Sequence, residues 1–140
     1  MPINYPTNLK AISIHAPFAY AICLGLKTEE YRTQPTKRRG WVLIHASQSK
    51  ASDEYFITYN IDKSGVKRGA IIGAVQITDC TGTDGNWAYQ LNSPVLFEQP
   101  VEDVRGKQAI FWGANSRELQ EAFTLASQQI AKFLNVNGVV

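Results

Sequence analysis

Hydrophobic residues recur with the two-residue period of β-strands over most of the chain, or form short continuous apolar runs. Turn residues bound these segments, and the predicted strands cover residues 9–14, 28–33, 41–46, 69–80, 87–91, 94–97 and 108–112. Gly73, inside the longest run, predicts a bend or a bulge of the kind that barrel strands need. Asn92-Ser93-Pro94 is expected to separate two of the strands. The pattern up to residue 112 is therefore mostly β.

A short helix is predicted directly after the first strand. Pro17 suits the first turn of a helix, and Gly25 is placed to end that helix in a left-handed conformation. His15 lies at the helix start, where it is expected to act as a structural cap. A second short helix is predicted within residues 52–64, where Gly65 would end it.

The helical period is clearest near the end of the chain. Asn115 and Glu118 have the spacing of a capping box, with Asn in place of Ser or Thr. An apolar stripe follows, formed by Leu119, Ala122, Phe123, Ala126, Ile130 and Phe133. We expect this helix to pack on the β-structure as a covering element without a catalytic role.

Charges are densest beside apolar segments in GLKTEEYRT, residues 25–33. If residues 28–33 are extended, Glu30 and Arg32 lie on one face of the strand, because side chains alternate between faces. Lys27, just before the strand, can aim its ammonium at the same place. These three side chains, called the polar wall below, would then line a cleft. The alternative on spacing alone is a solvated edge strand whose charges discourage edge pairing.

Composition describes an ordinary folded chain. The 140 residues are 44% hydrophobic and 19% charged, which fits one domain with a real core. The net charge of +2 is far from the excess expected of a protein that neutralises phosphates nonspecifically, so a nucleic-acid role needs a local patch. No apolar run approaches the length of a membrane span, so we expect no membrane association and a cytoplasmic protein.

Cysteine and histidine are too few for several kinds of site. Cys23 and Cys80 cannot form a disulfide framework or a cysteine-based zinc site, and buried free thiols are expected. The two histidines are not accompanied by clustered carboxylate or cysteine ligands. We therefore expect neither a metal nor a cofactor.

Four segments in order resemble the ASCH domain (ASC-1 homology) family, a branch of the PUA-like superfamily. They are ISIHAPFAYAICLGLKTEEYR, RGWVLIHAS, GAIIGAVQITDC and WAYQLNSPVLFEQPVEDVRGKQAIFW. The most specific elements are the helix entry with Pro17 and an aromatic residue, the GxKxxExR pattern that starts at Gly25, and the strand ending in IHAS. The resemblance implies an α+β fold, a small and partly open PUA-like β-barrel with flanking helices that include a C-terminal helix. Residues 1–140 would form a single ASCH domain.

The resemblance also implies a cleft beside the strand that follows the first helix, where the family is proposed to bind RNA or modified nucleobases. Some members hydrolyse an acylated cytidine with a lysine, a threonine three residues later and a distant glutamate. The lysine matches Lys27, but Glu30 stands at the threonine's position, and a carboxylate cannot act as that hydroxyl nucleophile. Other members are ribonucleases, without a motif that matches this sequence residue by residue.

These observations favour an RNA-binding or single-stranded nucleic-acid-binding protein that recognises a nucleobase or a strand end. Arg32 offers a planar fork, Glu30 an acceptor for an exocyclic amine, and Lys27 a compact cation. One alternative is a hydrolase on a modified nucleoside or a ribonuclease, with Lys27 as base or charge stabiliser and Glu30 as acid or base. The other alternative is a coactivator-like protein-interaction module.

Further candidates extend this site. Lys37, Arg38 and Arg39 form either a grip on backbone phosphates or a solvated loop. The stacking candidates are Phe18, Trp41 and Trp87, although burial in the core is the competing role for the tryptophans.

His45 and Ser47 lie at the end of one predicted strand on the same face. They are candidates for lining a polar pocket. A catalytic dyad is the other interpretation, and it requires a mutual hydrogen bond and an orienting third group, which a spacing of two residues cannot establish.

Overall fold

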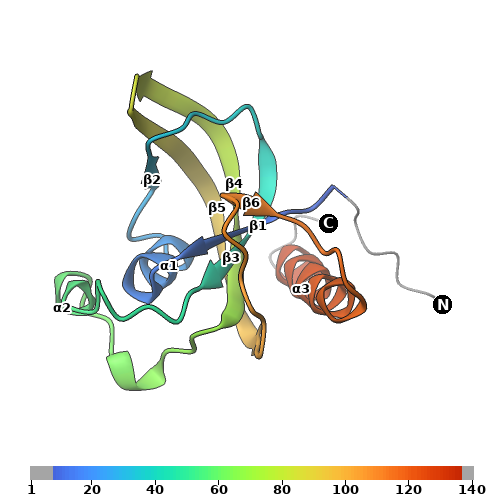
Figure 1. Cartoon of the computed structure of the whole chain (residues 1–140). Coiled ribbons are helices and arrows are strands. Elements are labelled where there is room, and N and C mark those ends of the chain that lie inside the picture. Colours follow the sequence, from blue (N-terminus) through green and yellow to red (C-terminus); the bar gives the residue numbers. More distant parts are fainter. Residues whose placement is uncertain (1–7, 137–140) are drawn as a thin grey trace.

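The computed structural model describes residues 8–136. Within them, six strands form one mixed sheet in the order β2-β5-β4-β3-β1-β6, which curls into a half-barrel (Figure 1). The strands are β1 (Ala11–Ile14), β2 (Glu29–Arg32), β3 (Gly40–Ala46), β4 (Ala70–Thr83), β5 (Asn86–Val101) and β6 (Phe111–Trp112). β1 and β3 pair in parallel, whereas the other pairs in this part of the chain are antiparallel. The predicted α+β fold with a partly open barrel is confirmed, and the open barrel takes the form of this half-barrel.

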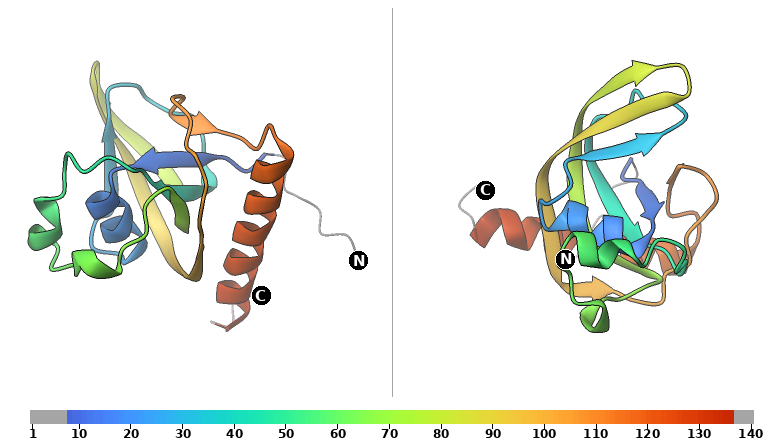
Figure 2. Two further views of the ribbon diagram at one scale, coloured as in Figure 1. Left: turned by 60° about the horizontal axis from the view of Figure 1, so that its bottom comes forward. Right: turned by 90° about the vertical axis from the view of Figure 1, so that its left-hand side faces the viewer.

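Helices cover both faces of the sheet. They are α1 (Ala16–Cys23), α2 (Tyr55–Thr58), the short 3-10 helix η1 (Lys63–Gly65) and α3 (Arg117–Val136). Figure 2 shows α1 and α3 on opposite sides of the sheet. As predicted, the C-terminal helix packs on the β-structure through its apolar stripe. Of that stripe only Phe133 is exposed, at 37%.

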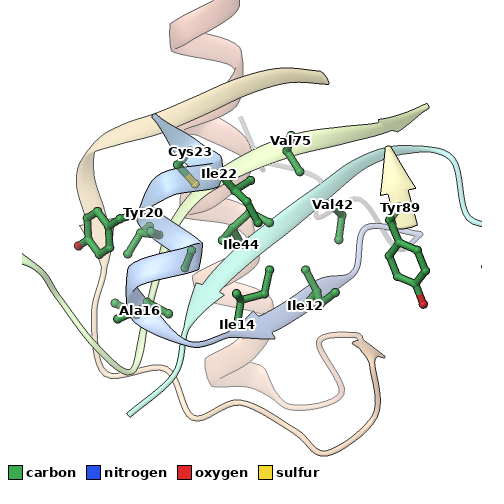
Figure 3. Packing of buried hydrophobic residues seen from close by; sticks show 14 of the residues in the cluster. Ile12, Ile14, Ala16, Tyr20, Ile22, Cys23, Val42, Ile44, Val75 and Tyr89 are labelled. Carbon is green, nitrogen blue, oxygen red and sulfur yellow. The ribbon is translucent and has the colours of Figure 1, made fainter. Parts of the chain in front are cut away.

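Two hydrophobic cores follow from the alternation of side chains along the strands. On the concave face, Ile22 of α1 points toward Ile44 of β3 (Figure 3). On the other face, Leu43 of β3 packs with Phe123 of α3. Residues next to one another in β3 therefore belong to different cores, and the face on which a polar side chain lies determines its surroundings.

Gly73 lies where the sequence predicts an irregularity. The register between β4 and β5 shifts between Ile71 and Gly73. A Cβ at Gly73 would collide with the backbone oxygen of Val95 and the sulfur of Cys23. The predicted bend is thus confirmed, and it also lets α1 approach the sheet closely.

The predicted break at Asn92-Ser93-Pro94 is wrong. β5 runs through this segment without interruption, and the adjacent register shift lies between Ala74 and Gln76 of β4. Ser93 has a φ of 56°, in the left-handed region. The turn-forming sequence therefore produces a local irregularity within β5 and does not end the strand. The predicted strand at 108–112 shortens to the two residues of β6.

The first helix has the predicted limits. Gly25 has a φ of 80° and follows the last turn of α1, which confirms its role in ending the helix. His15 occupies the N-cap position, but its side chain makes no capping bond; its Nδ1 instead lies 2.7 Å from the Ser52 hydroxyl. The helix predicted within 52–64 is only the four residues of α2, and Gly65 ends the separate η1.

The capping prediction for the last helix is wrong by one residue. α3 begins at Arg117, which makes Ser116 the N-cap. The backbone N–H of Leu119 donates to the Ser116 hydroxyl at 3.2 Å, the usual N-cap bond, so Asn115 and Glu118 do not form a capping box. Serine caps a helix as well as asparagine does, and the spacing of Asn115 and Glu118 was therefore misleading.

Cys23 is a buried free thiol, as predicted, and Cys80 is free but half-buried. Within residues 8–136, no helix has the length and apolar character needed to cross a membrane.

Candidate functional site

The polar wall forms one cluster. Arg32 Nε lies 2.8 Å from Glu30 Oε2, and Lys27 Nζ lies 3.5 Å from Glu30 Oε1, so the carboxylate sits between two cations. The Glu30 side chain is only 11% exposed, and those of Lys27 and Arg32 are 12% and 25% exposed. These three residues do not splay into solvent as an edge strand of surface charges would.

Local structure explains why the cluster forms. Gly25 turns the chain after α1, and the backbone N–H of Lys27 donates to the Ala21 carbonyl at 3.1 Å. The Lys27 side chain then turns back over β2, and its ammonium donates a hydrogen bond to the Glu29 carbonyl. Glu30 pairs with Tyr89 of β5, whose side chain belongs to the concave core. The cluster therefore faces the inside of the half-barrel.

Strand parity separates Glu29 from this cluster, as predicted. Its carboxylate accepts hydrogen bonds from the Tyr31 hydroxyl at 2.7 Å and from the Gln90 amide at 2.6 Å, on the other face of β2. These two donors lower the pKa of the Glu29 carboxyl. Because Glu29 bonds Tyr31 and Gln90, Glu30 is the only one of the two carboxylates that belongs to the polar wall.

The electrostatic environment of Lys27 differs from that of a surface lysine. Burial lowers the pKa of its ammonium, while the neighbouring Glu30 carboxylate opposes this shift. Its Nζ also lies 4.8 Å from the ring centroid of Tyr31 and 5.9 Å from that of Phe18, within the range of cation–π attraction. Lys27 is a partly desolvated cation held by one carboxylate and two aromatic faces.

Arg32 also bridges the open side of the half-barrel. Its Nη2 donates to the Ser13 carbonyl at 3.1 Å, although β2 ends the sheet on one side and β1 lies near the other. The Tyr89 hydroxyl makes a second link from the sheet by donating to the Gln34 carbonyl at 2.7 Å. These bonds fix the curvature that brings the concave face around the polar wall.

His45 and Ser47 lie away from the polar wall. His45 packs against Trp112 of the α3-side core, with ring centroids 5.4 Å apart, and lies opposite Ile71 in β4. That core is on the opposite face of the sheet from Glu30. The structure therefore brings Lys27, Glu30 and Arg32 together and separates His45 and Ser47 from them.

The partner of His45 is Ser13, not Ser47. His45 Nδ1 lies 3.0 Å from Ser13 Oγ, and its Nε2 lies 2.7 Å from the Val104 carbonyl. Ser47 Oγ has no hydrogen-bond partner within residues 8–136. The dyad interpretation of His45 with Ser47 lacks its required hydrogen bond, and both residues line a polar pocket instead.

The bonds of His45 determine its tautomer. A carbonyl oxygen only accepts, so Nε2 carries the proton that is donated to Val104. Nδ1 then accepts from the Ser13 hydroxyl, whose oxygen accepts from Trp112 Nε1 at 3.1 Å. Burial lowers the pKa of His45, while the bond to Val104 opposes this shift. A neutral imidazole satisfies every group of this network.

The basic loop lies between the concave face and α3, since Arg38 and Arg39 also line the hollow against α3 that contains Trp41. The Arg38 guanidinium carbon lies 5.4 Å from the ring centroid of Phe111, which stacks on Tyr89 at 6.0 Å. Arg39 donates to the carbonyls of its own loop and lies 3.7 Å from Asp79. Lys37 is exposed. Tyr89 is the cross-strand partner of Glu30, so a continuous path of side chains joins this loop to the polar wall.

The three stacking candidates have different surroundings. Phe18 is half-buried beside Tyr55, with ring centroids 5.0 Å apart, and beside Lys27. Trp87 is half-buried directly opposite Arg32 and shares a hollow of about 520 Å³ with it. Trp41 lies in a separate hollow against α3. Phe18 and Trp87 therefore flank the polar wall, and Trp41 does not.

Sequence reasoning missed Ser13, Tyr89 and Trp112. Alternation along the strands indicates that each of these side chains faces a core. It does not reveal their hydrogen-bond partners, which lie on distant segments of the chain. Among residues 8–136, no three His, Cys, Asp or Glu side chains gather in an arrangement that would hold a metal ion.

Comparisons with known proteins agree with this architecture. The model of the ASCH domain family matches residues 12–124. The crystal structure of an ASCH protein from Zymomonas mobilis superposes with a TM-score of 0.57 at 18% identity, over 87% of this chain and 96% of that chain. Two single-substitution variants of the Zymomonas protein give TM-scores of 0.55, at 15% and 16% identity, over 89% and 95% of this chain and 96% and 99% of theirs.

No match was found among curated proteins. Structural likeness at such low identity establishes the fold alone, and that fold is the PUA-like half-barrel. The family model spans most of the sequence, from β1 into α3. The chain belongs to the ASCH domain family.

Proposed function

We propose that this protein binds single-stranded RNA and recognises an unstacked nucleobase or a strand end at the polar wall. The observation that carries the proposal is the Glu30 carboxylate, nearly buried between Arg32 and Lys27 on the concave face. Arg32 retains donors beyond the two that it uses, and Glu30 can accept from an exocyclic amine. This set of groups matches the edge of a base better than it matches an apolar ligand.

Neighbouring side chains supply the other parts of a nucleic-acid site. Phe18 and Trp87 flank the wall and offer aromatic faces on which bases can stack. Lys37, Arg38 and Arg39 lie at the far end of the Tyr89–Phe111 path, where they would contact backbone phosphates. A strand that crosses the concave face would meet the basic loop and the wall in succession.

Binding of a fluorescein-labelled single-stranded RNA pool, measured by anisotropy at several salt concentrations, tests this proposal. Affinity should fall as salt rises, because phosphate contacts release counterions. Arg32→Ala should weaken binding by about tenfold or more, the effect of losing about 1.4 kcal/mol. Arg117→Ala removes the same charge from an exposed position on α3 and should change affinity less than twofold.

Absence of binding to any RNA pool, or equal losses in the two variants, would refute the assignment. A circular dichroism spectrum and a thermal melt of each variant separate lost binding from lost folding, because Arg32 also holds the half-barrel together through Ser13.

A second candidate is hydrolysis of a modified nucleoside or of RNA at the same wall. The partly desolvated Lys27 favours it, since burial lowers the pKa of the ammonium toward the range useful for proton transfer. Lys27 would act as base or charge stabiliser, and Glu30, at 3.5 Å, as its acid or base partner.

Mass spectrometry of acylated cytidines and of single-stranded RNA after prolonged incubation tests this candidate. Turnover that disappears in Lys27→Met but persists in Lys132→Met, a change on the exposed surface of α3, would support it. Unchanged substrates would eliminate it while leaving the binding proposal intact.

A further inference from the structure

A second pocket lies on the face of the sheet opposite the polar wall. It has a volume of about 650 Å³ and is bounded by the end of β3, the start of β4 and the loop 103–108. His45 and Ser13 form its floor, and their side chains belong to the α3 side of the sheet. We call it the His45 pocket. A volume of this size is typical of small-molecule sites.

The floor of the His45 pocket is rigid because its polar groups are satisfied. His45 holds the Val104 carbonyl through Nε2, and the Val104 N–H donates to the Gly69 carbonyl at 2.8 Å. Gly106 packs so closely that a Cβ there would lie 2.5 Å from Ser13 Oγ and 3.0 Å from His45 Cε1. The loop is therefore fixed in position over the imidazole.

The walls of the pocket are basic. Arg68 is held in place by the Ser49 carbonyl at 3.0 Å and by Asp53 at 2.9 Å. Arg105 and Lys107 come from the loop, are exposed, and have no ion-pair partner within residues 8–136. Asp103 is the one carboxylate among the lining residues.

We propose that the His45 pocket binds a phosphate monoester, with Arg105 and Lys107 as its principal contacts. Asp53 neutralises Arg68, so Arg105 and Lys107 against Asp103 leave an excess of positive charge that favours an anion. Guanidinium and ammonium groups are the side chains that bind phosphate best. The Ser47 hydroxyl, which is buried and has no partner within residues 8–136, belongs to a residue of the same lining. This proposal does not depend on the function of the polar wall, because the two sites lie on opposite faces.

Two kinds of molecule carry this group, a free nucleotide and the phosphorylated end of a strand. Isothermal titration with adenosine 5′-monophosphate and with adenosine isolates the contribution of the phosphate. A short oligonucleotide with a 5′-phosphate, compared with the same oligonucleotide with a 5′-hydroxyl, identifies the strand end. We expect the phosphorylated member of at least one pair to bind about tenfold more tightly.

Variants locate the phosphate. Arg105→Ala combined with Lys107→Ala should weaken the binding of adenosine 5′-monophosphate by about tenfold or more, the effect of losing about 1.4 kcal/mol. The matched control, Arg117→Ala with Lys132→Ala, removes the same charge from exposed positions of α3 and should change affinity less than twofold.

Gly106→Ala provides a test that removes no charge. The added methyl group must displace the loop, so it should weaken phosphate binding if the pocket is preorganised, whereas a diffuse positive field would be unaffected. A thermal melt confirms that the variant is folded. Equal affinities within both pairs of ligands, or equal losses in the two double variants, would each overturn the proposal.

Discussion

Replacement of Glu30 by glutamine is the most direct test of the polar wall. The substitution preserves the size of the side chain and one acceptor oxygen but removes the negative charge. Lys27 and Arg32 would then face each other across a neutral group, and both are largely buried. The change should lower the free energy of unfolding, because two partly desolvated cations lose their counter-charge.

The distances set the magnitude of this loss. The bond from Arg32 Nε to Glu30 Oε2, at 2.8 Å, is charge-assisted, and such bonds contribute about 1.5–3 kcal/mol. The contact with Lys27 at 3.5 Å is at the limit of a hydrogen bond and adds less. Because glutamine keeps a neutral acceptor and Arg32 is partly hydrated, we expect a loss of about 2 kcal/mol. For a chain of 140 residues this corresponds to a decrease in Tm of about 6–8 °C.

Urea unfolding followed by circular dichroism measures the loss, and Glu98→Gln is the matched control. Glu98 pairs with Lys132 at 2.9 Å, but its side chain is 75% exposed, so its substitution should cost less than about 0.5 kcal/mol. The pKa of Lys27, followed by NMR, should also fall in Glu30→Gln, since the carboxylate that opposes the effect of burial is gone. Equal stability of the two variants, or an unchanged pKa of Lys27, would show that the wall is an ordinary surface cluster.

Three further predictions test the fold and the His45 network. The pKa of His45 is lowered in the folded state, so unfolding takes up a proton below pH 6.5 and the free energy of unfolding falls as the pH decreases. Urea titrations at pH 5.5 and 7.5 should show a smaller fall of this free energy in His45→Gln than in the unaltered protein. Gly73→Ala should destabilise the protein by about 3 kcal/mol in thermal melts, because the new methyl group meets the Val95 carbonyl; a change below about 1 kcal/mol would contradict the close packing. Ser116→Ala should cost about 1 kcal/mol as the loss of an N-cap, whereas Asn115→Ala should cost little, and the reverse order in urea unfolding would restore the capping box that the structure rejects.

Periodicity was sufficient where a contact is determined by near neighbours in the sequence. The two-residue alternation of β2 places Glu30 with Arg32 and separates Glu29 from them, whatever the rest of the chain does. The turn at Gly25 requires a positive φ that glycine adopts without strain. Nine consecutive residues therefore predicted which side chains share a face, but they left open whether that face lines a cleft or lies in solvent, which the curvature of the sheet decides.

Contacts between distant segments were not predictable in this way. His45 and Ser47 are close in the sequence, but Ser13 is the parallel-strand neighbour of His45, and only the pairing of β1 with β3 brings them together. The wrong prediction at Ser93 has the same cause, a contact with a distant segment. The turn residues there suggest a break, but pairing with β4 keeps β5 continuous.

Strand β1 gives a physical reason for treating the two faces as separate sites. Ser13 contacts both of them, but with different atoms. Its backbone carbonyl accepts from Arg32, whereas its hydroxyl bonds His45. A change of the Ser13 side chain therefore acts on the His45 network and leaves the acceptor of Arg32 in place. The half-barrel thus connects the polar wall and the His45 pocket through one strand without a shared side chain.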